Sequence, residues 1–293
     1  MGDKMKKFDY LKPTSLDEVF SLMEKFGSNA KLIAGGTDVM VLLKRKRIFP
    51  DVLISLRSVP NMAYIKDEKD KIRIGSMTTH RELETSTVIK EKLTALYDAV
   101  INLGSVQIRN VATIGGNIAN AAPSADTACP LLVLDASCLL ISSKGEREVE
   151  LKDFFIAPGE TVMKQDEILK EFIIPKPSKL SGSAYWKLSR RKAMDLPILG
   201  VAISLAMNED KSIKKARIGL GVAAPTPIRA FKAEEFLTGK FLTDEVLAEA
   251  GNIASKEASP RDSIRGEAWY RREMIRVLTK RVATISFKRA NIV

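Results

Sequence analysis

The sequence predicts a protein of mixed α-helices and β-strands with two or three domains. Its 293 residues correspond to about two domains of ordinary size. Segments with apolar residues at helical spacing alternate with short β-like stretches that end in glycine turns. Apolar residues make up 45% of the chain and charged residues 28%. This composition is typical of a globular protein and excludes disorder or a collagen-like structure.

The N-terminal part predicts a helix, a glycine turn and two strands. Ser15-Leu16-Asp17-Glu18 has the pattern of a capping box, and apolar residues follow it at helical spacing. Residues 31–34 read as a short strand that leads into the turn Gly35-Gly36-Thr37-Asp38. Residues 39–44 predict a helix after this turn, and residues 51–56 predict another strand.

The middle of the chain contains its most unusual segment. Residues 62–65 and 72–74 predict a hairpin, and residues 86–103 predict one helix. In the segment that follows, nearly every side chain from 113 to 126 is small or polar. We therefore expect residues 113–126 to form a close-fitting ligand cradle and to contribute no core.

The C-terminal part predicts a second sheet covered by helices. Strands are expected at 138–142, 147–151 and 168–174, and the Pro175-Lys176-Pro177-Ser178 stretch predicts a domain boundary. Beyond it we expect a three-stranded sheet from residues 184–189, 198–207 and 213–222, followed by helices near residues 231–237, 243–255 and 267–286.

Cysteine and histidine are scarce, which limits metal chemistry. Cys129 and Cys138 lie nine positions apart, a spacing that matches no zinc or iron–sulfur motif, so we expect small buried hydrophobic residues. The single histidine, His80, excludes a His-rich zinc site. Because Thr79-His80-Arg81-Glu82 resembles a helix start, we expect His80 at the surface or in a capping role.

The net charge of +11 suggests acidic partners and raises nucleic-acid binding as one alternative. The tail from residue 260 to 293 carries nine basic and three acidic residues but lacks interleaved aromatic side chains, which argues against nucleic acid. The longest apolar run, 128–141, is broken by Pro130 and Asp135 and is shorter than the roughly 20 residues of a membrane helix. We expect no membrane span and a cytoplasmic protein.

The two glycine pairs, Gly35-Gly36 and Gly115-Gly116, each follow a β-like stretch and precede hydroxyl, amide or carboxylate residues. Successive backbone N–H groups at such turns can bind an anion such as a pyrophosphate, with help from a helix start. Thr37 could add a hydroxyl, and Asn117 or Asn120 an amide. Neither pair fits the Rossmann or P-loop motif, so ordinary tight turns remain an alternative.

Four motifs resemble the FAD-binding subunits of molybdenum hydroxylases, a family that includes carbon monoxide dehydrogenase medium subunits and xanthine dehydrogenase FAD domains. They are Phe8-Asp9-Tyr10-Leu11-Lys12-Pro13-Thr14-Ser15-Leu16-Asp17-Glu18, Ala34-Gly35-Gly36-Thr37-Asp38, Thr113-Ile114-Gly115-Gly116-Asn117-Ile118 through Pro123-Ser124-Ala125-Asp126, and Ala184-Tyr185-Trp186-Lys187-Leu188-Ser189-Arg190-Arg191-Lys192. The resemblance covers essentially the whole chain. It implies an α+β fold: a two-subdomain FAD-binding fold of the PCMH type, similar to vanillyl-alcohol oxidase, over residues 1–58 and 59–177. A C-terminal three-stranded sheet with helices over 178–293 follows.

The resemblance also implies a non-covalent FAD and its contacts. The first glycine turn would wrap the pyrophosphate, and residues of the second glycine segment would approach it; the residues are Ile33, Ala34, Gly35, Gly36, Thr37, Asp38, Thr113, Gly116 and Asn117. Asn120, Ser124 and Asp126 would serve the ribose and adenine half. Ile168 and Leu169 would border the isoalloxazine ring, and Lys187 would lie near its polar edge. Alternative roles are core packing for Ile168 and Leu169, a solvated charge for Lys187 and helix capping for Asp126.

The implied function is electron transfer within a complex. A large partner subunit would carry the molybdenum cofactor and a small one the [2Fe–2S] clusters, and the resemblance implies a dimer of such heterotrimers. This chain would take electrons from the clusters to FAD and pass them to an external acceptor, with no catalytic acid or base and no metal of its own. Arg190-Arg191-Lys192 is expected as a solvated turn with a possible docking role. A stand-alone flavin oxidase is the main alternative.

Overall fold

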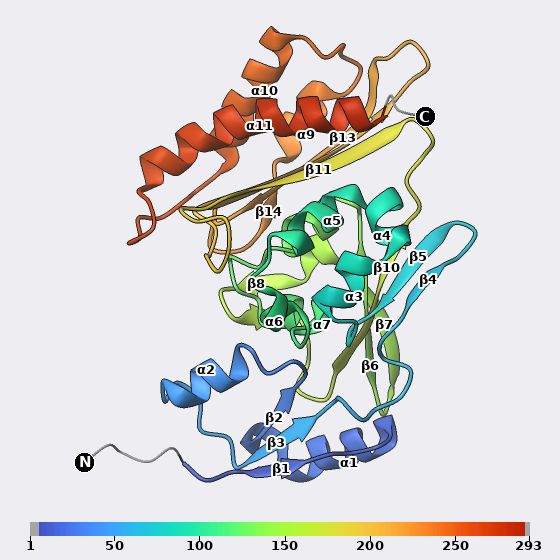
Figure 1. Cartoon of the computed structure of the whole chain (residues 1–293), viewed down its shortest axis with the longest axis vertical. Helices are drawn as coiled ribbons and strands as arrows, with labels where there is room; N and C mark the ends of the chain where they lie inside the picture. The colour runs from blue at the N-terminus through green and yellow to red at the C-terminus, as the bar shows by residue number, and fades with distance from the viewer. Residues whose placement is uncertain (1–5, 291–293) are drawn as a thin grey trace.

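The computed structural model describes residues 6–290 and arranges them around three main sheets that follow one another along the long axis of the molecule (Figure 1). The first sheet is parallel, with the order β1-β3-β2. Its elements are β1 (Asp9–Leu11), α1 (Leu16–Phe26), the 3₁₀ helix η1 (Gly27–Asn29), β2 (Ala30–Ile33), α2 (Val39–Lys44) and β3 (Val52–Ser55). All four residues of the central strand β3 are buried.

Helix α1 begins where its sequence predicts. The Ser15 hydroxyl accepts the backbone N–H of Glu18 at 3.1 Å, as an N-cap should. The Glu18 carboxylate does not complete the capping box on Ser15, because it accepts the N–H of Thr14 instead, at 2.8 Å. Both contacts tie the chain before α1 to its first turn.

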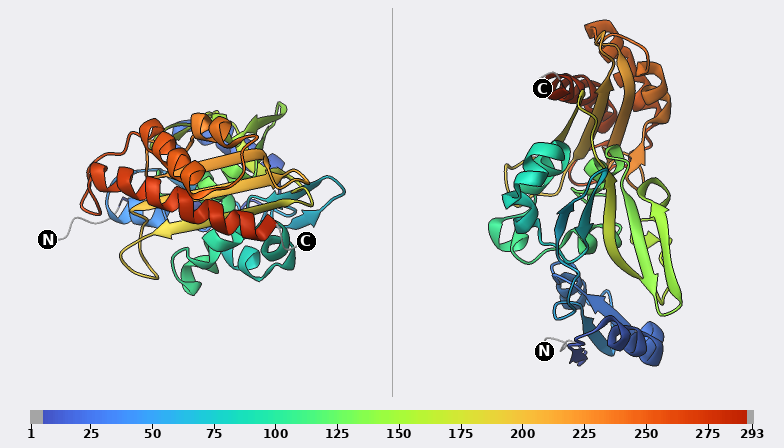
Figure 2. Two further views of the ribbon diagram at one scale, coloured as in Figure 1. Left: turned by 90° about the horizontal axis from the view of Figure 1, so that it is seen from above. Right: turned by 90° about the vertical axis from the view of Figure 1, so that its right-hand side faces the viewer.

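The second sheet is antiparallel, with the order β4-β5-β10-β6-β7, and its helices cover one face (Figure 2). Its elements are β4 (Ile65–Asp67), β5 (Lys71–Gly75), α3 (His80–Thr85), α4 (Thr87–Lys92), α5 (Thr94–Ile101), α6 (Val106–Arg109), α7 (Ile114–Ala119), α8 (Ala128–Val133), β6 (Ser137–Ser142), β7 (Gly145–Glu150), the 3₁₀ helix η2 (Leu151–Asp153), β8 (Phe155–Ala157), β9 (Glu160–Thr161) and β10 (Ile168–Pro175). Strands β8 and β9 pair separately.

Three predictions for this region are wrong. The helix expected over residues 86–103 is two helices, because the backbone leaves helical geometry at the buried residue Leu93 (φ −121°, ψ 56°). The hairpin begins at Ile65, and Met62 lies outside the strand with a buried side chain. The segment 113–126 does contribute to the core, since Ile114 and Ile118 of α7 are fully buried.

The third sheet is antiparallel and has four strands, β11 (Ser181–Leu188), β12 (Leu199–Met207), β13 (Ile213–Gly221) and β14 (Ile228–Arg229). Sequence analysis predicted the first three; β14 is only two residues long. Helices α9 (Phe231–Leu237), α10 (Asp244–Glu257) and α11 (Ala268–Ala290) cover the outer face (Figure 1). Tyr185 and Ala202 point instead into the core of the middle region, so both faces of this sheet are covered.

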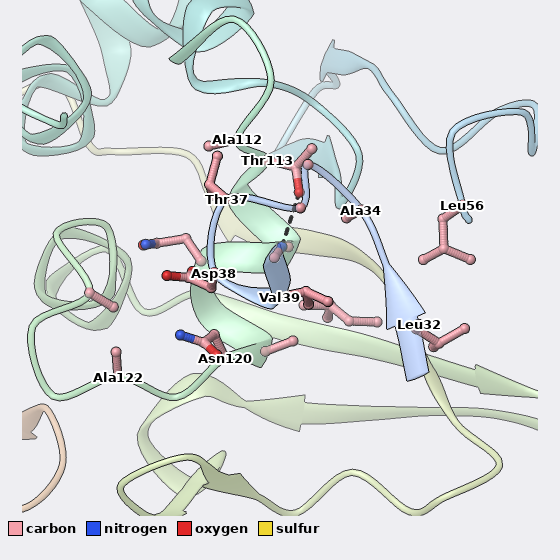
Figure 3. A pocket seen from close by; sticks show the side chains of 18 of the residues that line it. Leu32, Ala34, Thr37, Asp38, Val39, Leu56, Ala112, Thr113, Asn120 and Ala122 are labelled. Carbon is pink, nitrogen blue, oxygen red and sulfur yellow. Dashed lines mark hydrogen bonds between the residues drawn. The ribbon is translucent and has the colours of Figure 1, made fainter. Parts of the chain in front are cut away.

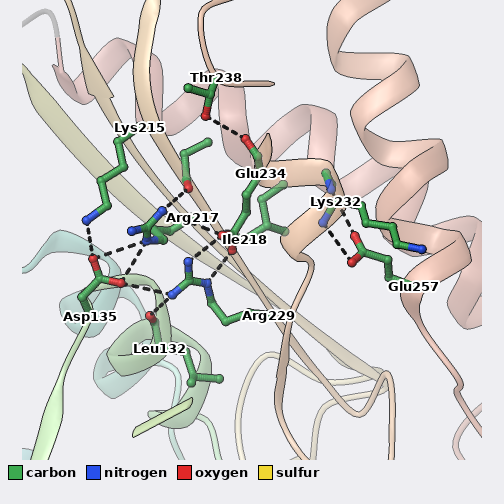
Figure 4. Close-up of polar contacts among 12 residues, drawn as sticks. Leu132, Asp135, Lys215, Arg217, Ile218, Arg229, Lys232, Glu234, Thr238 and Glu257 are labelled. Carbon is green, nitrogen blue, oxygen red and sulfur yellow. Dashed lines mark hydrogen bonds and ion pairs between the residues drawn. The ribbon is translucent and has the colours of Figure 1, made fainter. Parts of the chain in front are cut away.

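A cluster of charges joins the third sheet to the end of α8 (Figure 4). The Asp135 carboxylate accepts hydrogen bonds from Lys215 at 2.7 Å, Arg217 at 2.9 Å and Arg229 at 3.1 Å. Arg229 also pairs with Glu234, and both of these side chains are buried. Loss of Arg229 would leave the buried Glu234 carboxylate without its nearest cation, so the Arg229–Glu234 pair is the part of the cluster that fixes the packing most strongly. Asp135 has three cationic partners and is partly exposed, so it tolerates the loss of one of them.

Within residues 6–290, no helix is both long enough and apolar enough to cross a membrane, including the 23-residue α11. Cys129 and Cys138 are both buried and free. Burial raises the pKa of both thiols, so they remain protonated. Their predicted role as small buried hydrophobic residues is confirmed.

Candidate functional site

A cavity of about 610 Å³ lies between the first glycine turn and the helices of the middle region (Figure 3). This volume lies within the usual range for sites that enclose a small molecule or cofactor. Of the fifteen residues predicted for the site, all but Ile33 and Lys187 line it: Ala34, Gly35, Gly36, Thr37, Asp38, Thr113, Gly116, Asn117, Asn120, Ser124, Asp126, Ile168 and Leu169. The structure therefore brings the two glycine segments together as opposite walls.

The first glycine turn requires glycine at both positions. A Cβ atom on Gly35 would lie 2.1 Å from the carbonyl oxygen of Val111, so only glycine allows this close approach of two backbones. Gly36 has φ +78°, which lies in the left-handed region that other residues avoid. The close approach at Gly35 fixes the distance between the two walls of the cavity.

The same turn offers backbone donors to a ligand. Among the described residues, the N–H groups of Gly35, Gly36 and Thr37 have no hydrogen-bond partner. Three successive free N–H groups in a turn form a binding site for anionic oxygen atoms. Helix α2 is only six residues long, so these N–H groups provide the attraction and the helix dipole adds little.

The second glycine pair works differently from the prediction. Its N–H groups are already used: Gly115 donates to the carbonyl of Ser76 at 2.8 Å, and Gly116 donates to the Thr113 hydroxyl at 3.1 Å. Asn117 donates its N–H to the Thr113 carbonyl at 3.0 Å. The expectation that backbone N–H groups of both turns bind the anion is therefore wrong for this turn, which contributes side chains and close packing.

Asparagine side chains supply polar groups on this second wall. The Asn117 side-chain oxygen accepts the Thr127 hydroxyl at 2.6 Å, which leaves its NH₂ group for the cavity. Asn120 faces Thr37 and Asp38 across the cavity (Figure 3). Burial raises the pKa of the Asp38 carboxyl. These amide and carboxyl groups match the hydroxyl groups of a sugar.

A buried ion pair closes one end of the cavity. Lys187 donates to the Asp126 carboxylate at 2.8 Å and to the carbonyl of Asn102 at 3.1 Å, and the Tyr185 hydroxyl donates to Asp126 at 3.1 Å. Burial raises the pKa of Asp126, and the Lys187 ammonium opposes that rise. Helix capping, the alternative role considered for Asp126, is excluded because the helix that follows has no side-chain cap.

The contact between Asp126 and Lys187 does not fit the two separate places along the cofactor that were expected for them. Sequence analysis placed Asp126 at the adenine half and Lys187 at the flavin edge. Because the two side chains are in direct contact, both belong to the same end of the cavity. Lys187 reaches the cavity through Asp126, and it does not line the wall itself.

Ile168 and Leu169 begin strand β10 and both line the cavity, yet both are buried in hydrophobic cores. Ile168 packs with the first region and Leu169 with the middle one. Core packing is therefore shown for both residues, and their contact with the flavin ring stays a prediction. Ile33 is buried beneath the glycine turn and packs against Leu53 and Leu43.

The loop after β11 borders the cavity through Met194, Asp195 and Leu196. The Asp195 carboxylate accepts the backbone N–H groups of Arg190 and Arg191, at 3.1 Å and 3.2 Å. Both arginine side chains are exposed, so their prediction as a solvated turn is confirmed.

The other residues that line the cavity were not predicted individually, although Gly115, Ala119, Ala122 and Ala125 lie in the segment 113–126 that was expected as a ligand cradle. The residues outside that segment are Met23, Gly27, Ser28, Ala30, Lys31, Leu32, Val39, Leu56, His80, Leu103, Gly104, Ile108, Ala112, Met163, Gln165, Glu167, Met194, Asp195 and Leu196. For most of these residues, no motif or spacing in the sequence indicates a place at the cavity. His80 was singled out as the only histidine, but the surface or capping role expected for it is wrong. Thr79 is the N-cap of α3, and His80 is fully buried.

Comparison with known proteins decides the family. The sequence profile described as "FAD binding domain in molybdopterin dehydrogenase" matches residues 6–177, and that described as "CO dehydrogenase flavoprotein C-terminal domain" matches residues 184–285. The chain belongs to the FAD-binding subunits of molybdenum hydroxylases. FAD is thus its cofactor, and the chain is a component of an oxidoreductase.

Similar proteins cover nearly the whole of this FAD-binding subunit. The glyceraldehyde dehydrogenase medium chain of Sulfolobus acidocaldarius is 30% identical over 93% of this chain and 96% of its own length. The xanthine dehydrogenase FAD-binding subunit of Escherichia coli O157:H7 is 34% identical over 93% and 94%. The solved structure of carbon monoxide dehydrogenase from Hydrogenophaga pseudoflava has a TM-score of 0.94 at 30% identity, covering 98% of this chain and 99% of that one.

The residues present fit this cofactor. Free N–H groups at the first glycine turn suit a pyrophosphate, amide and carboxyl groups suit the sugar hydroxyls, and the apolar walls suit the rings. Among the described residues, no cysteine lines the cavity, and the one histidine there is fully buried. The FAD contacts of individual residues stay a prediction.

Proposed function

We propose that this subunit relays electrons: it holds FAD between [2Fe–2S] clusters of a small partner subunit and an external acceptor. A large partner subunit would carry the molybdenum cofactor and oxidise the substrate, in a cytoplasmic dimer of heterotrimers. FAD suits this position because it accepts electrons singly and releases them in pairs. The proposal rests mainly on the cavity, whose size, free backbone N–H groups and apolar walls suit a dinucleotide.

The residues of the chain would have separate tasks in this relay. The N–H groups of Gly35, Gly36 and Thr37 would hold the pyrophosphate, and the asparagines opposite would orient the sugar. Asp126 and Lys187 would fix one end of the cofactor. The main alternative, a stand-alone oxidase, needs a base for its substrate. His80 is poorly suited to be that base, because burial and the Arg109 charge lower its pKa to about 4.

The relay can be tested with the isolated subunit loaded with FAD. Acid precipitation should release yellow flavin into the supernatant, as expected for a non-covalent cofactor. An anaerobic titration with organic substrates of the complex should not bleach the flavin absorption, because oxidation needs the molybdenum subunit. Addition of the large and small subunits should then allow bleaching. Stoichiometric bleaching without partners would instead support the oxidase.

The basic surface of α11 would dock the partner subunits. A groove of about 650 Å³ runs along α11 between Trp186 and α10. Arg276 and Lys280 line it in pairs with acidic side chains, whereas Arg281 is exposed and has no partner among residues 6–290. The free charge and the exposed Trp186 favour an acidic, partly apolar partner surface.

Arg281→Glu should slow association with the partner subunits about tenfold at low salt, because reversal of a charge weakens long-range steering. Surface-binding or stopped-flow measurements at about 0.05 and 0.5 M salt should show wild-type association slowing and the variant changing less. Lys25→Glu, on the exposed side of α1 at the opposite end of the molecule (Figure 1), is the matched control and should associate normally. Equal slowing by both variants, or no dependence on salt, would contradict docking at α11.

A further inference from the structure

Basic residues flank the opening of the cofactor cavity on two sides. Met194 and Leu196 line the cavity and are 54% and 49% exposed, so they mark where the cavity opens to solvent. Their loop, residues 189–197, contains three basic residues and one acidic residue. Residues 38–47, which begin in the cavity wall and include α2, contain four basic residues and one acidic residue. The loop after β11 and α2 lie on the same side of the molecule (Figure 1).

The basic residues at the end of α2 have no acidic partners. Lys44, Arg45 and Arg47 are exposed, and none of the three forms an ion pair within residues 6–290. Lys44 follows Val39, which lines the cavity, by five residues, so the helix rise between them is about 7.5 Å. The acidic residue of this stretch, Asp38, lies in the cavity wall itself. The uncompensated positive charge is therefore close to the cavity opening.

The loop 189–197 also presents its basic side chains to solvent. Its acidic residue, Asp195, accepts the backbone N–H groups of Arg190 and Arg191, and the two guanidinium groups lie farther from it, at 3.9 Å and 3.7 Å. These arginine side chains are 57% and 65% exposed. Arg191 also donates to the carbonyl of Met194, which places its guanidinium beside the cavity opening. Lys192 is exposed and has no ion-pair partner in the described part of the chain.

Exposed apolar side chains accompany these charges. Val41 of α2 is 43% exposed and Val106 of α6 is 47% exposed, in addition to Met194 and Leu196 of the loop. A small anion is bound by donors that converge on it, whereas these basic side chains are spread over two segments. Exposed charge of one sign with apolar contacts is typical of a surface that docks a protein of opposite charge. The position of the charges around an opening favours a rounded protein over a flat lipid surface.

We propose that the external electron acceptor is an acidic carrier protein that docks over the cavity opening, between the end of α2 and the loop 189–197. The inference rests on the proposed function and names the class of its acceptor. Electron-transfer interfaces are small, and attraction between opposite charges speeds their formation. Two molecules of a one-electron carrier each gain one electron, while the reduced flavin loses two electrons and releases two protons to solvent. The α11 groove includes neither segment, which leaves the groove to the partner subunits.

Charge reversal at the end of α2 tests the inference in the FAD-loaded complex. The probes are the soluble haem domain of cytochrome b5, which is acidic, and cytochrome c, which is basic. In surface-binding measurements at about 0.05 M salt, Lys44→Glu/Arg45→Glu/Arg47→Glu should bind the oxidised acidic domain at least about tenfold more weakly than wild type. The difference should shrink at about 0.5 M salt. Cytochrome c should not bind wild type measurably at either salt concentration.

A matched control reverses a charge far from the cavity. Lys69 lies in the turn between β4 and β5, on the other side of the molecule from α2 (Figure 1). It is exposed and forms no ion pair within the described residues. Lys69→Glu should bind the acidic domain as wild type does. Lys192→Glu, on the loop across the opening, should weaken the same binding severalfold, because both sides of the opening contact the carrier.

The outcomes are distinct. If the wild-type complex does not bind the acidic domain, or if Lys69→Glu weakens binding as much as the α2 variant, the inference is wrong. If the α2 variant no longer assembles with the large and small subunits, this surface is a subunit interface and the inference is also wrong. Binding to vesicles that contain phosphatidylglycerol, without binding to the acidic domain, would replace the carrier protein by a membrane surface. A complex that contains no FAD would instead contradict the proposed function.

Discussion

Gly116→Val is expected to lower FAD affinity by at least about a hundredfold, or about 2.7 kcal/mol, while the chain stays folded. A Cβ at Gly116 would lie 3.0 Å from the Thr113 hydroxyl and 3.7 Å from the Cβ of Ala34. Residue 116 has ordinary helical geometry in α7, so valine is tolerated by the backbone. Its methyl groups would fill the space between the two walls, next to the free N–H groups that would bind the pyrophosphate.

The neighbouring glycine provides the contrasting variant. A Cβ at Gly115 would lie 2.4 Å from the Cβ of Ser76 and 2.7 Å from its carbonyl oxygen, where α7 packs against the residue that follows β5. Gly115→Ala should therefore lose structure and FAD together. Circular dichroism and flavin absorbance after desalting separate the two cases. If Gly116→Val retains stoichiometric FAD and a native spectrum, residue 116 does not face the cofactor.

These two glycines show what local sequence signals can predict. The pair Gly115-Gly116 was correctly expected at the cavity because small residues allow close approach. The sequence could not show that the backbone N–H groups of this pair are unavailable to a ligand. The N–H of Gly115 donates to the carbonyl of Ser76, nearly forty residues earlier in the chain. Hydrogen bonds between distant segments decide which backbone donors remain free for a ligand.

The same reason limits other predictions. The start of α1 was predicted closely because its Ser15 cap is local in the sequence, and the bounds of α9 were predicted closely although α9 has no side-chain cap. The backbone N–H of His80 is held by Ala112, and the partner of Asp126 is Lys187, 61 residues later in the chain on β11. The neighbours of His80 in the sequence indicate a helix start, and its burial follows from the packing of α3 against the glycine segment, which the sequence does not reveal.

Lys187→Met is expected to destabilise the apo chain by about 3 kcal/mol, because it leaves the Asp126 carboxylate buried without its cation. Asp126 is 6% exposed and would retain only the Tyr185 hydroxyl as a partner. The double variant Lys187→Met/Asp126→Asn should recover most of the loss, since no charge then remains buried. Lys215→Met is the matched control: it removes an ion pair of similar length, to Asp135, but on a half-exposed lysine. It should cost at most about 1 kcal/mol.

The pH dependence of the Lys187→Met defect identifies its cause. Without the ammonium, burial raises the pKa of Asp126 in the folded state further above that in the unfolded state, and only the Tyr185 hydrogen bond opposes the rise. A carboxyl group whose pKa is higher in the folded state than in the unfolded state destabilises the fold only when it is ionised. The free energy of unfolding therefore falls as the pH rises from the unfolded-state pKa through the folded-state pKa. Chemical denaturation near pH 4.5 and near pH 8 should therefore show a smaller difference between variant and wild type at the lower pH. An equal difference at both would mean that Lys187 acts through packing of its aliphatic chain, and that the buried charge of Asp126 does not control this end of the cavity.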